Sequence, residues 1–205
     1  MSIKIKVCGI TNLEDGCIVS KLGADALGFI FAPSPRNIEP GIAKNIIEKL
    51  PPFITTVGVF KNERLDVVNR IIRLTGIDAI QLHGSEPPEY CKLIKNARII
   101  KRIKIDDDSN PNDIIREMAR YTVSAYLFDP GEGSGNIFDW EIIKGIKGTI
   151  IVGGGLNQNN VKTMIELLRP YGVDVCSGVE RSPGKKDPEK ILKFIKEVRR
   201  CSLQV

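Results

Sequence analysis

Eight short runs of apolar, mostly β-branched residues recur along the chain, and a helix-like pattern follows each one. We predict strands over residues 3–9, 25–31, 54–60, 78–83, 98–105, 124–129, 149–154 and 173–178. We predict helices over residues 12–23, 39–50, 63–75, 87–95, 111–121, 138–146, 157–169 and 187–200. Several strand runs are apolar at nearly every position, which is typical of parallel strands covered on both faces. This alternation predicts an α/β protein, a single (β/α)8 TIM barrel over residues 1–205.

A doubly wound parallel sheet is the competing architecture. It usually has fewer strands and carries a GxGxxG motif after the first one, and the chain shows neither feature. No linker or low-complexity segment interrupts the pattern, so we see no domain boundary.

Composition excludes several classes of protein. Apolar residues make up 42% of the chain and charged residues 27%, which is ordinary for a soluble globular protein. No apolar run approaches the roughly 18 residues of a membrane span, and no secretory signal is visible. Five cysteines without a CxxC motif fit a reducing compartment, so we expect a cytoplasmic protein. A single histidine, His83, and the scattered cysteines argue against a structural zinc site.

The net charge of +5 is concentrated near the C-terminus. Residues 185–205 hold seven Lys or Arg and three Asp or Glu, within a predicted amphipathic helix. We interpret these lysines as a solvated helix face. No basic stripe interleaved with aromatic residues suggests a nucleic-acid partner.

Active sites of this architecture lie at the carboxyl ends of the strands. Cys8 ends the first strand, where a buried thiol and a catalytic thiol are both compatible with position. Asp129 ends an apolar strand, so it is either functional or satisfied by a cap or an ion pair. Arg36 lies in a loop stiffened by prolines and is either a carboxylate clamp or a surface charge. His83 either polarises a substrate or binds a neighbouring strand end.

Two glycine-containing loops follow the seventh and eighth strands. Gly154 and Gly155 lie in the first, before a helix predicted to begin at Asn157, and Ser177 and Gly178 lie in the second. Loops at these two strands form the recurrent phosphate site of TIM barrels, because backbone N–H groups and helix N-termini attract anions. Tight turns are the alternative reading. Cys176 adjoins this site, and its alternation with Ser177 favours barrel packing.

Seven motifs make the pattern specific, and they come in one order along nearly the whole chain. They are KVCGIT at 6–11, SPR at 34–36, QLHG at 81–84, LFD at 127–129, FDW at 138–140, GGL at 154–156 and SGVE at 177–180, followed by GKKD. The ordered set resembles the phosphoribosylanthranilate isomerase family of tryptophan biosynthesis.

This resemblance implies an Amadori rearrangement of N-(5-phosphoribosyl)anthranilate to 1-(2-carboxyphenylamino)-1-deoxyribulose 5-phosphate, without cofactor or metal. It implies that Cys8 is the general base, that Asp129 is the general acid and that Arg36 faces the anthranilate carboxylate. The other residues expected to bind substrate are His83, Gly154, Gly155, Ser177 and Gly178. The expected partner is thus a small phosphosugar bearing an anthranilate group. A monomer and a homodimer both remain open.

The chain departs from the family pattern in two places. The loop after the sixth strand reads GEGSG, so Glu132 adds a negative charge and Ser134 replaces a threonine. Cys176 stands where the family pattern DVSSGVE has its first serine.

The chemistry of the rearrangement agrees with an acid and a base at the barrel mouth. The furanose oxygen must gain a proton for the ring to open, and a carboxylic acid with a raised pKa can donate it. The C2 proton must then leave toward a base, and a thiolate suffices because the neighbouring iminium accepts the electrons.

Other readings stay open from the residues alone. Another small phosphosugar barrel, such as a ribulose-phosphate epimerase, would need several metal-binding histidines and aspartates. A non-catalytic phosphate-binding subunit would not need both Cys8 and Asp129. A second, histidine-pathway substrate would require a second phosphate site, for which we see no clear signal.

Overall fold

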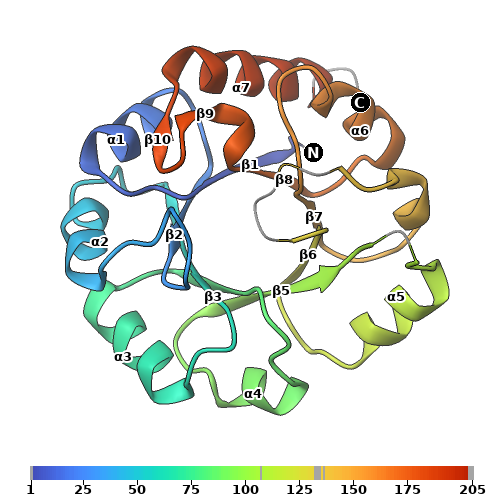
Figure 1. Ribbon diagram of the computed structural model, residues 1–205, viewed down its shortest axis with the longest axis horizontal. Coiled ribbons are helices and arrows are strands. Elements are labelled where there is room, and N and C mark those ends of the chain that lie inside the picture. Colours follow the sequence, from blue (N-terminus) through green and yellow to red (C-terminus); the bar gives the residue numbers. More distant parts are fainter. Residues whose placement is uncertain (1, 107, 132–134, 136, 203–205) are drawn as a thin grey trace.

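The predicted strands close into one parallel barrel (Figure 1) in a computed structural model, which describes residues 2–106, 108–131, 135 and 137–202. The barrel strands are β1 (Lys4–Cys8), β2 (Ala26–Ile30), β3 (Thr55–Phe60), β4 (Ala79–Leu82), β5 (Arg98–Lys104), β6 (Ala125–Asp129), β7 (Ile150–Val152) and β8 (Gly172–Val175). Each pairs with its neighbour in sequence, and β8 pairs with β1. The predicted (β/α)8 architecture is confirmed.

Helices cover the outside of the barrel (Figure 1). They are α1 (Leu13–Lys21), α2 (Pro40–Ile47), α3 (Leu65–Thr75), α4 (Pro88–Leu93), α5 (Pro111–Ala119), α6 (Val161–Leu168) and α7 (Pro188–Ser202). Local chemistry starts α1 and α5, because the side chains of Asn12 and Asn110 accept hydrogen bonds from N–H groups of their first turns. In the part of the chain that the structure describes, no helix is long and apolar enough to cross a membrane.

Two helix predictions between β6 and β8 need correction. In place of a helix over residues 138–146, the structure has a short 3₁₀ turn, η1 (Trp140–Ile143). Gly145 follows with a φ of 81°, which leaves too few residues for a regular α-helix. The helix predicted to begin at Asn157 begins at Val161 instead. Asn157 and Asn160 use their side chains to bind nearby backbone N–H groups, which favours a turn over helix.

The interior of the barrel changes from apolar to polar along the strands. An apolar layer at the amino ends is formed by Val57, Ala79, Ile100, Ala125, Leu127 and Ile151. Strand residues two positions apart share a face. The positions that follow Ala79 and Leu127 on the same face are Gln81 and Asp129. The polar interior therefore begins halfway up the barrel and opens at the carboxyl ends of the strands.

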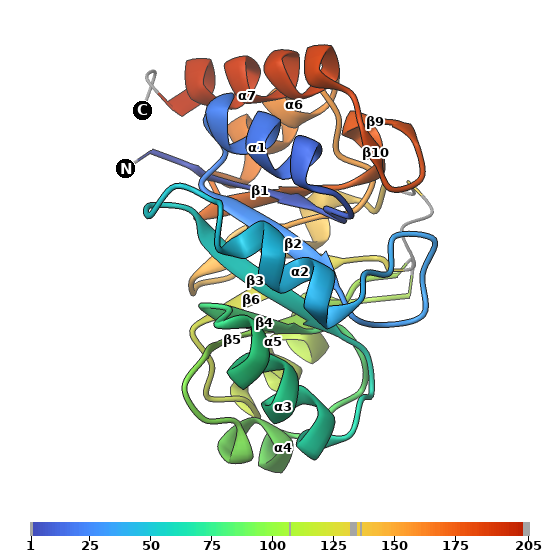
Figure 2. The same ribbon diagram turned by 90° about the vertical axis from the view of Figure 1, so that its left-hand side faces the viewer.

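A hairpin follows the last barrel strand. The short turn η2 (Ser177–Val179) leads into β9 (Glu180–Ser182), which pairs antiparallel with β10 (Lys185–Lys186). Figure 2 shows this hairpin at the end of the barrel opposite the two chain termini. It brings Glu180 and Lys186, both buried, to the carboxyl end of β1.

Candidate active site

One cavity opens at the carboxyl ends of the strands and brings most of the predicted residues together. Its lining includes Cys8, Arg36, His83, Asp129, Gly154, Gly155 and Ser177. Gly178 does not line this cavity. A Cβ there would collide with the backbone carbonyl of Leu156, so the glycine allows the two predicted phosphate loops to pack against each other.

Cys8 is the last residue of β1, and it is a buried residue of the cavity wall. The neighbouring thiol of Cys176 lowers the pKa of Cys8 to about 7, against the effect of burial, and the positive charge of Lys6 acts in the same direction. A thiol with this pKa is substantially ionised at neutral pH. Cys8 can therefore act as a base.

A buried ion pair lies close to Cys8. Nζ of Lys6 is 2.7 Å from Oδ2 of Asp174, and both side chains are less than 10% exposed. Burial alone would lower the pKa of Lys6, but the charges of Asp174 and the Cys8 thiolate outweigh it and raise that pKa. Within the described residues, Oδ1 of Asp174 has no hydrogen-bond partner, and Asp174 lines the cavity.

Asp129 ends β6, and its side chain is 16% exposed. Oδ1 accepts a 2.7 Å hydrogen bond from the N–H of Gly131 and lies 3.9 Å from Nε of Arg102. Burial raises the pKa of the Asp129 carboxyl, and the negative charge of Asp174 raises it further, although Arg102 opposes both. The site thus favours a carboxylic acid that can donate a proton.

His83 lies between Gln81 and Asp129. Nε2 of Gln81 is 3.1 Å from Nδ1 of His83, and Nε2 of His83 is 3.9 Å from Oδ1 of Asp129. Burial, followed by the charge of Arg102, lowers the pKa of His83 to about 3. The ring is neutral at physiological pH, so its contact with Asp129 is not an ion pair.

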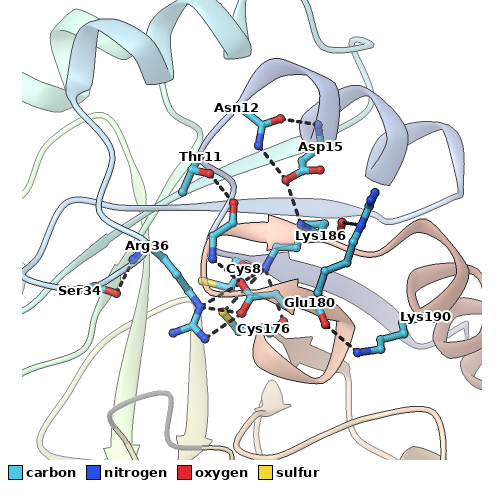
Figure 3. A network of polar contacts seen from close by, with 12 residues as sticks. Cys8, Thr11, Asn12, Asp15, Ser34, Arg36, Cys176, Glu180, Lys186 and Lys190 are labelled. Carbon is cyan, nitrogen blue, oxygen red and sulfur yellow. Dashed lines mark hydrogen bonds and ion pairs between the residues drawn. The ribbon is translucent and has the colours of Figure 1, made fainter.

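Arg36 is buried at the edge of the cavity and is held by Glu180 (Figure 3). Nε of Arg36 is 3.0 Å from both carboxylate oxygens, and Nη2 is 2.8 Å from Oε2. Oε1 of Glu180 also accepts a 2.9 Å hydrogen bond from Nζ of Lys186. Glu180 therefore lies between two buried cations and orients the predicted carboxylate clamp.

Side-chain hydrogen bonds fix the first of the two predicted phosphate loops, which contains Gly154 and Gly155. The carbonyl oxygen of Gly155 accepts hydrogen bonds from the side-chain amides of Asn157 and Asn160, at 3.2 and 3.0 Å. In the described part of the chain, the N–H groups of Gly154 and Gly155 donate to no protein acceptor. Donors of this kind at a cavity wall are suited to an anion. Helix α6 begins only at Val161, so its N-terminus is farther from these glycines than the sequence predicted.

Among the described residues, no group of three or more His, Cys, Asp or Glu side chains is arranged to hold a metal ion. The departures predicted at Glu132 and Ser134 lie outside the described residues. The neighbouring Gly131 and Gly135 line the cavity.

Residues 5–197 match the family model described as N-(5'-phosphoribosyl)anthranilate (PRA) isomerase. The chain belongs to the PRA isomerase family. It is 46% identical over 202 residues to the N-(5'-phosphoribosyl)anthranilate isomerase of Pelobacter propionicus, across 95% of this chain and 94% of that protein. It is also 45% identical over 208 residues to the enzyme of Citrifermentans bemidjiense, across 98% of both chains.

Solved structures of PRA isomerases have the same fold. The enzyme of Thermotoga maritima superposes with a TM-score of 0.88 at 40% identity, over 97% of this chain and 99% of that chain. The enzyme of Thermus thermophilus superposes with a TM-score of 0.88 at 36% identity, over 96% and 98%. Another PRA isomerase, solved with reduced 1-(o-carboxyphenylamino)-1-deoxyribulose 5-phosphate, gives 0.85 at 38% identity, over 97% and 99%.

Sequence reasoning from the family pattern missed the supporting charges of the site. Lys6 and Asp174 are charged residues inside buried strands, and that interruption of an apolar run was the available signal. Cys176 was expected to pack in the barrel, whereas it lines the cavity beside Cys8. Glu180 and Lys186 belong to the SGVE and GKKD motifs, but no local pattern shows that they pair with each other and with Arg36.

Proposed function

We propose that the chain converts N-(5'-phosphoribosyl)anthranilate to 1-(2-carboxyphenylamino)-1-deoxyribulose 5-phosphate, with Cys8 as general base and Asp129 as general acid. Its family makes it an isomerase of tryptophan biosynthesis. One observation carries the residue assignment. A thiol with a lowered pKa and a carboxyl with a raised pKa line the same cavity from β1 and β6. Pairs of titratable groups whose pKa values are shifted in opposite directions are typical of acid–base sites.

Asp129 donates its proton to the furanose ring oxygen. The nitrogen lone pair forms a double bond to C1 as the C1–oxygen bond breaks, which leaves an open-chain iminium and an aspartate anion. A raised pKa in Asp129 favours this donation, because the acid is protonated before the step. Arg102 then lies 3.9 Å from the anion, where its positive charge stabilises the carboxylate.

The Cys8 thiolate next removes the proton from C2. The electron pair of that C–H bond forms a C1–C2 double bond and neutralises the iminium nitrogen, which gives an enolamine that tautomerises to the ketose. The positive charge of Lys6 favours the thiolate before this step. Neutral His83 lines the cavity without adding a competing charge, and its N–H group is suited to a sugar hydroxyl.

The two charged ends of the substrate fit opposite sides of the cavity. The phosphate is assigned to the N–H groups of Gly154, Gly155 and Ser177, since their loops follow β7 and β8 and line the cavity, and Gly178 contributes by letting the two loops pack together. The anthranilate carboxylate is assigned to Arg36, whose guanidinium Glu180 already holds in a fixed orientation. Each assignment is supported by the residue's position and donors.

The alternative of another phosphosugar barrel has weaker support. Thiamine phosphate pyrophosphorylase of Pyrococcus furiosus superposes with a TM-score of 0.70 at 16% identity, which shows a shared fold alone. A non-catalytic phosphate-binding subunit would have no use for a thiol and a carboxyl with opposed pKa shifts in one cavity.

Two further properties are part of this proposal. The ligand is a small phosphosugar. The assembly is a monomer or a homodimer, and the structure of monomers generated from a dimeric PRA isomerase of Thermotoga maritima has been solved. The cytoplasm is the proposed compartment, and all five cysteines are free thiols, as a reducing compartment requires.

The test follows loss of substrate fluorescence with the purified chain. We expect turnover in the wild type, and a fall in kcat of about 10²–10⁴ in both Cys8→Ala and Asp129→Asn, the usual contribution of a positioned acid or base. Cys17→Ser, which changes a half-buried thiol on α1, serves as the control and keeps normal turnover. Near-normal turnover in Cys8→Ala would overturn the assignment of the base, and no turnover in the wild type would overturn the proposed reaction.

A further inference from the structure

Cys8 ends β1, and Cys176 directly follows β8, the strand that pairs with β1 in parallel. Val7 of β1 is in register with Val175 of β8, and the residue that follows each of these valines is a cysteine. Both line the cavity, and Figure 3 shows their side chains next to each other. We propose that Cys176 is a positioning residue for Cys8, whose thiol donates a hydrogen bond to the Cys8 sulfur and stabilises it as the thiolate. This inference rests on the role of Cys8 as base proposed above.

Lys186 fixes the two strand ends relative to each other. Its Nζ is 2.5 Å from the carbonyl oxygen of Cys8 and 3.5 Å from that of Cys176. The same Nζ lies 3.9 Å from Sγ of Cys176, and the lysine is 1% exposed. A single buried ammonium group thus holds both backbones in place, which limits how far the two thiols can separate.

Gly9 confines the sulfur of Cys176 from the other side. A Cβ on Gly9 would lie 3.1 Å from Sγ of Cys176 and 2.8 Å from Cδ of Arg36. The sulfur therefore packs directly against the backbone at Gly9, the residue after Cys8. No side chain at position 9 separates the two cysteines.

The charged groups around the thiol pair are largely neutralised by one another. Lys6 of β1 is paired with Asp174 of β8. Arg36, from the loop after β2, and Lys186 of β10 are both paired with Glu180 of β9. Because Lys6, Arg36 and Lys186 each already have a carboxylate partner, a neutral donor has a large share in stabilising a thiolate here.

The titration of the pair agrees with this geometry. Among the influences that lower the pKa of Cys8, the neighbouring Cys176 thiol is the largest, and the same contact, with burial, raises the pKa of Cys176. Cys176 therefore keeps its proton at neutral pH and remains a donor. The serine that the family pattern has at this position would donate through a hydroxyl, so Cys176→Ser retains the donor and Cys176→Ala removes it.

The test measures the ionisation of Cys8 directly. The rate of iodoacetamide alkylation is followed against pH, with each modified cysteine identified by peptide mass spectrometry. We expect a midpoint near the lowered pKa of about 7 for Cys8 in the wild type. In Cys176→Ala the midpoint rises by about one pH unit, as expected for loss of a hydrogen bond to a charged group. In Cys176→Ser it stays within about half a unit of the wild type.

Three further measurements make the result decisive. Cys17→Ser, on the outside of the barrel, leaves the Cys8 midpoint unchanged. Cys176→Val keeps the approximate volume of the side chain without a donor, so it replaces the alanine variant if that variant does not fold. The acid limb of the pH profile of kcat/KM moves upward together with the alkylation midpoint.

Two results would overturn the inference: an unchanged Cys8 midpoint in Cys176→Ala, or in Cys176→Val where it replaces that variant, or preferential alkylation of Cys176 near neutral pH. Failure of the proposed function gives a different result. If the alkylation midpoint moves while Cys8→Ala remains active, the thiol contact stands and the role of Cys8 as base is wrong.

Discussion

Replacing Glu180 with glutamine tests how the predicted carboxylate clamp is held. Glu180 is 6% exposed, and its two oxygens accept hydrogen bonds from Arg36 and Lys186, which are 8% and 1% exposed. Its Oε1 also accepts from the N–H of Gly184 in the β9–β10 turn. Glu180→Gln retains the shape of the side chain but removes the negative charge that both cations share.

The expected cost follows from the burial of the three side chains. Removing one partner of a buried ion pair costs about 3–5 kcal/mol, because the other charge is left uncompensated. The glutamine oxygen still accepts one hydrogen bond, which recovers about 1 kcal/mol. We therefore expect the free energy of unfolding to fall by about 2–4 kcal/mol. Because Arg36 is no longer fixed, affinity for the reduced product analogue should fall at least about 10-fold.

Glu86→Gln is the matched control. Glu86 is also a buried carboxylate, 2.9 Å from Nζ of Lys101, and it accepts hydrogen bonds from the N–H groups of Asn62 and Gly84. It does not line the site cavity. Urea unfolding should show a similar loss of stability in both variants, whereas calorimetric titration should show the large loss of analogue affinity only in Glu180→Gln. Equal loss of affinity in both variants would refute the reasoning about Arg36.

The pH dependence gives a second check on the same substitution. Burial alone would raise the pKa of Glu180, but hydrogen bonds and charge from Arg36 and Lys186 lower it below its ordinary value of 4.5. A carboxyl whose pKa is lowered on folding stabilises the protein above the ordinary value and loses that contribution as the pH falls through the lowered one. The difference in stability between wild type and Glu180→Gln should therefore shrink below about pH 4.5. A difference that stays constant down to acid unfolding would contradict an ionised Glu180.

Three other outcomes are expected. Arg36→Ala should weaken analogue binding about 30-fold or more in a calorimetric titration, because one partner of a desolvated charge pair is lost. Glu180 keeps its ion pair with Lys186 in this variant. Unchanged affinity would contradict the assignment of Arg36 as the carboxylate clamp. Gly178→Ala should raise KM more than it lowers kcat in steady-state kinetics. The reason is that a Cβ at position 178 would collide with the carbonyl of Leu156 and disturb both predicted phosphate loops. An unaltered KM would argue against a phosphate site at these loops. Diamide should take two electrons and two protons from the adjacent thiols of Cys8 and Cys176 and so form a disulfide. This disulfide should stop turnover until dithiothreitol is added, and Cys176→Ser should resist inactivation by diamide. Peptide mapping that finds no such crosslink would show that the two thiols are too far apart.

Local sequence was a good guide wherever structure depends on local patterns. The eight apolar runs predicted the strands to within about two residues at most ends, because strands buried on both faces require continuous apolar residues. The helix predictions between β6 and β8, in contrast, were wrong in extent. There Gly145 and the side chains of Asn157 and Asn160 decide the backbone, and these effects outweigh helical periodicity.

The position of residues along their strands also predicted much of the site. Parallel strands of a barrel all end on one side, so residues at their carboxyl ends must gather at one mouth. Cys8, His83 and Asp129 were placed together by this rule, and all of them line the cavity. Arg36 and the two glycine-containing loops were also predicted from their positions after the second, seventh and eighth strands, and the family pattern added the anthranilate carboxylate as the group that Arg36 faces. None of this reasoning, however, could assign a protonation state, since a pKa depends on burial and on charges from other strands.

The sequence by itself thus determined the number and order of the strands and which residues stand at their ends. Only the tertiary structure decided which of these groups touch. Lys6 and Asp174 are 168 positions apart, yet they form a 2.7 Å ion pair because closure of the barrel makes β1 and β8 neighbours. The same closure brings Cys176 to Cys8. Pairing of the first strand with the last is a property of the closed barrel, so no local pattern in either strand could reveal it.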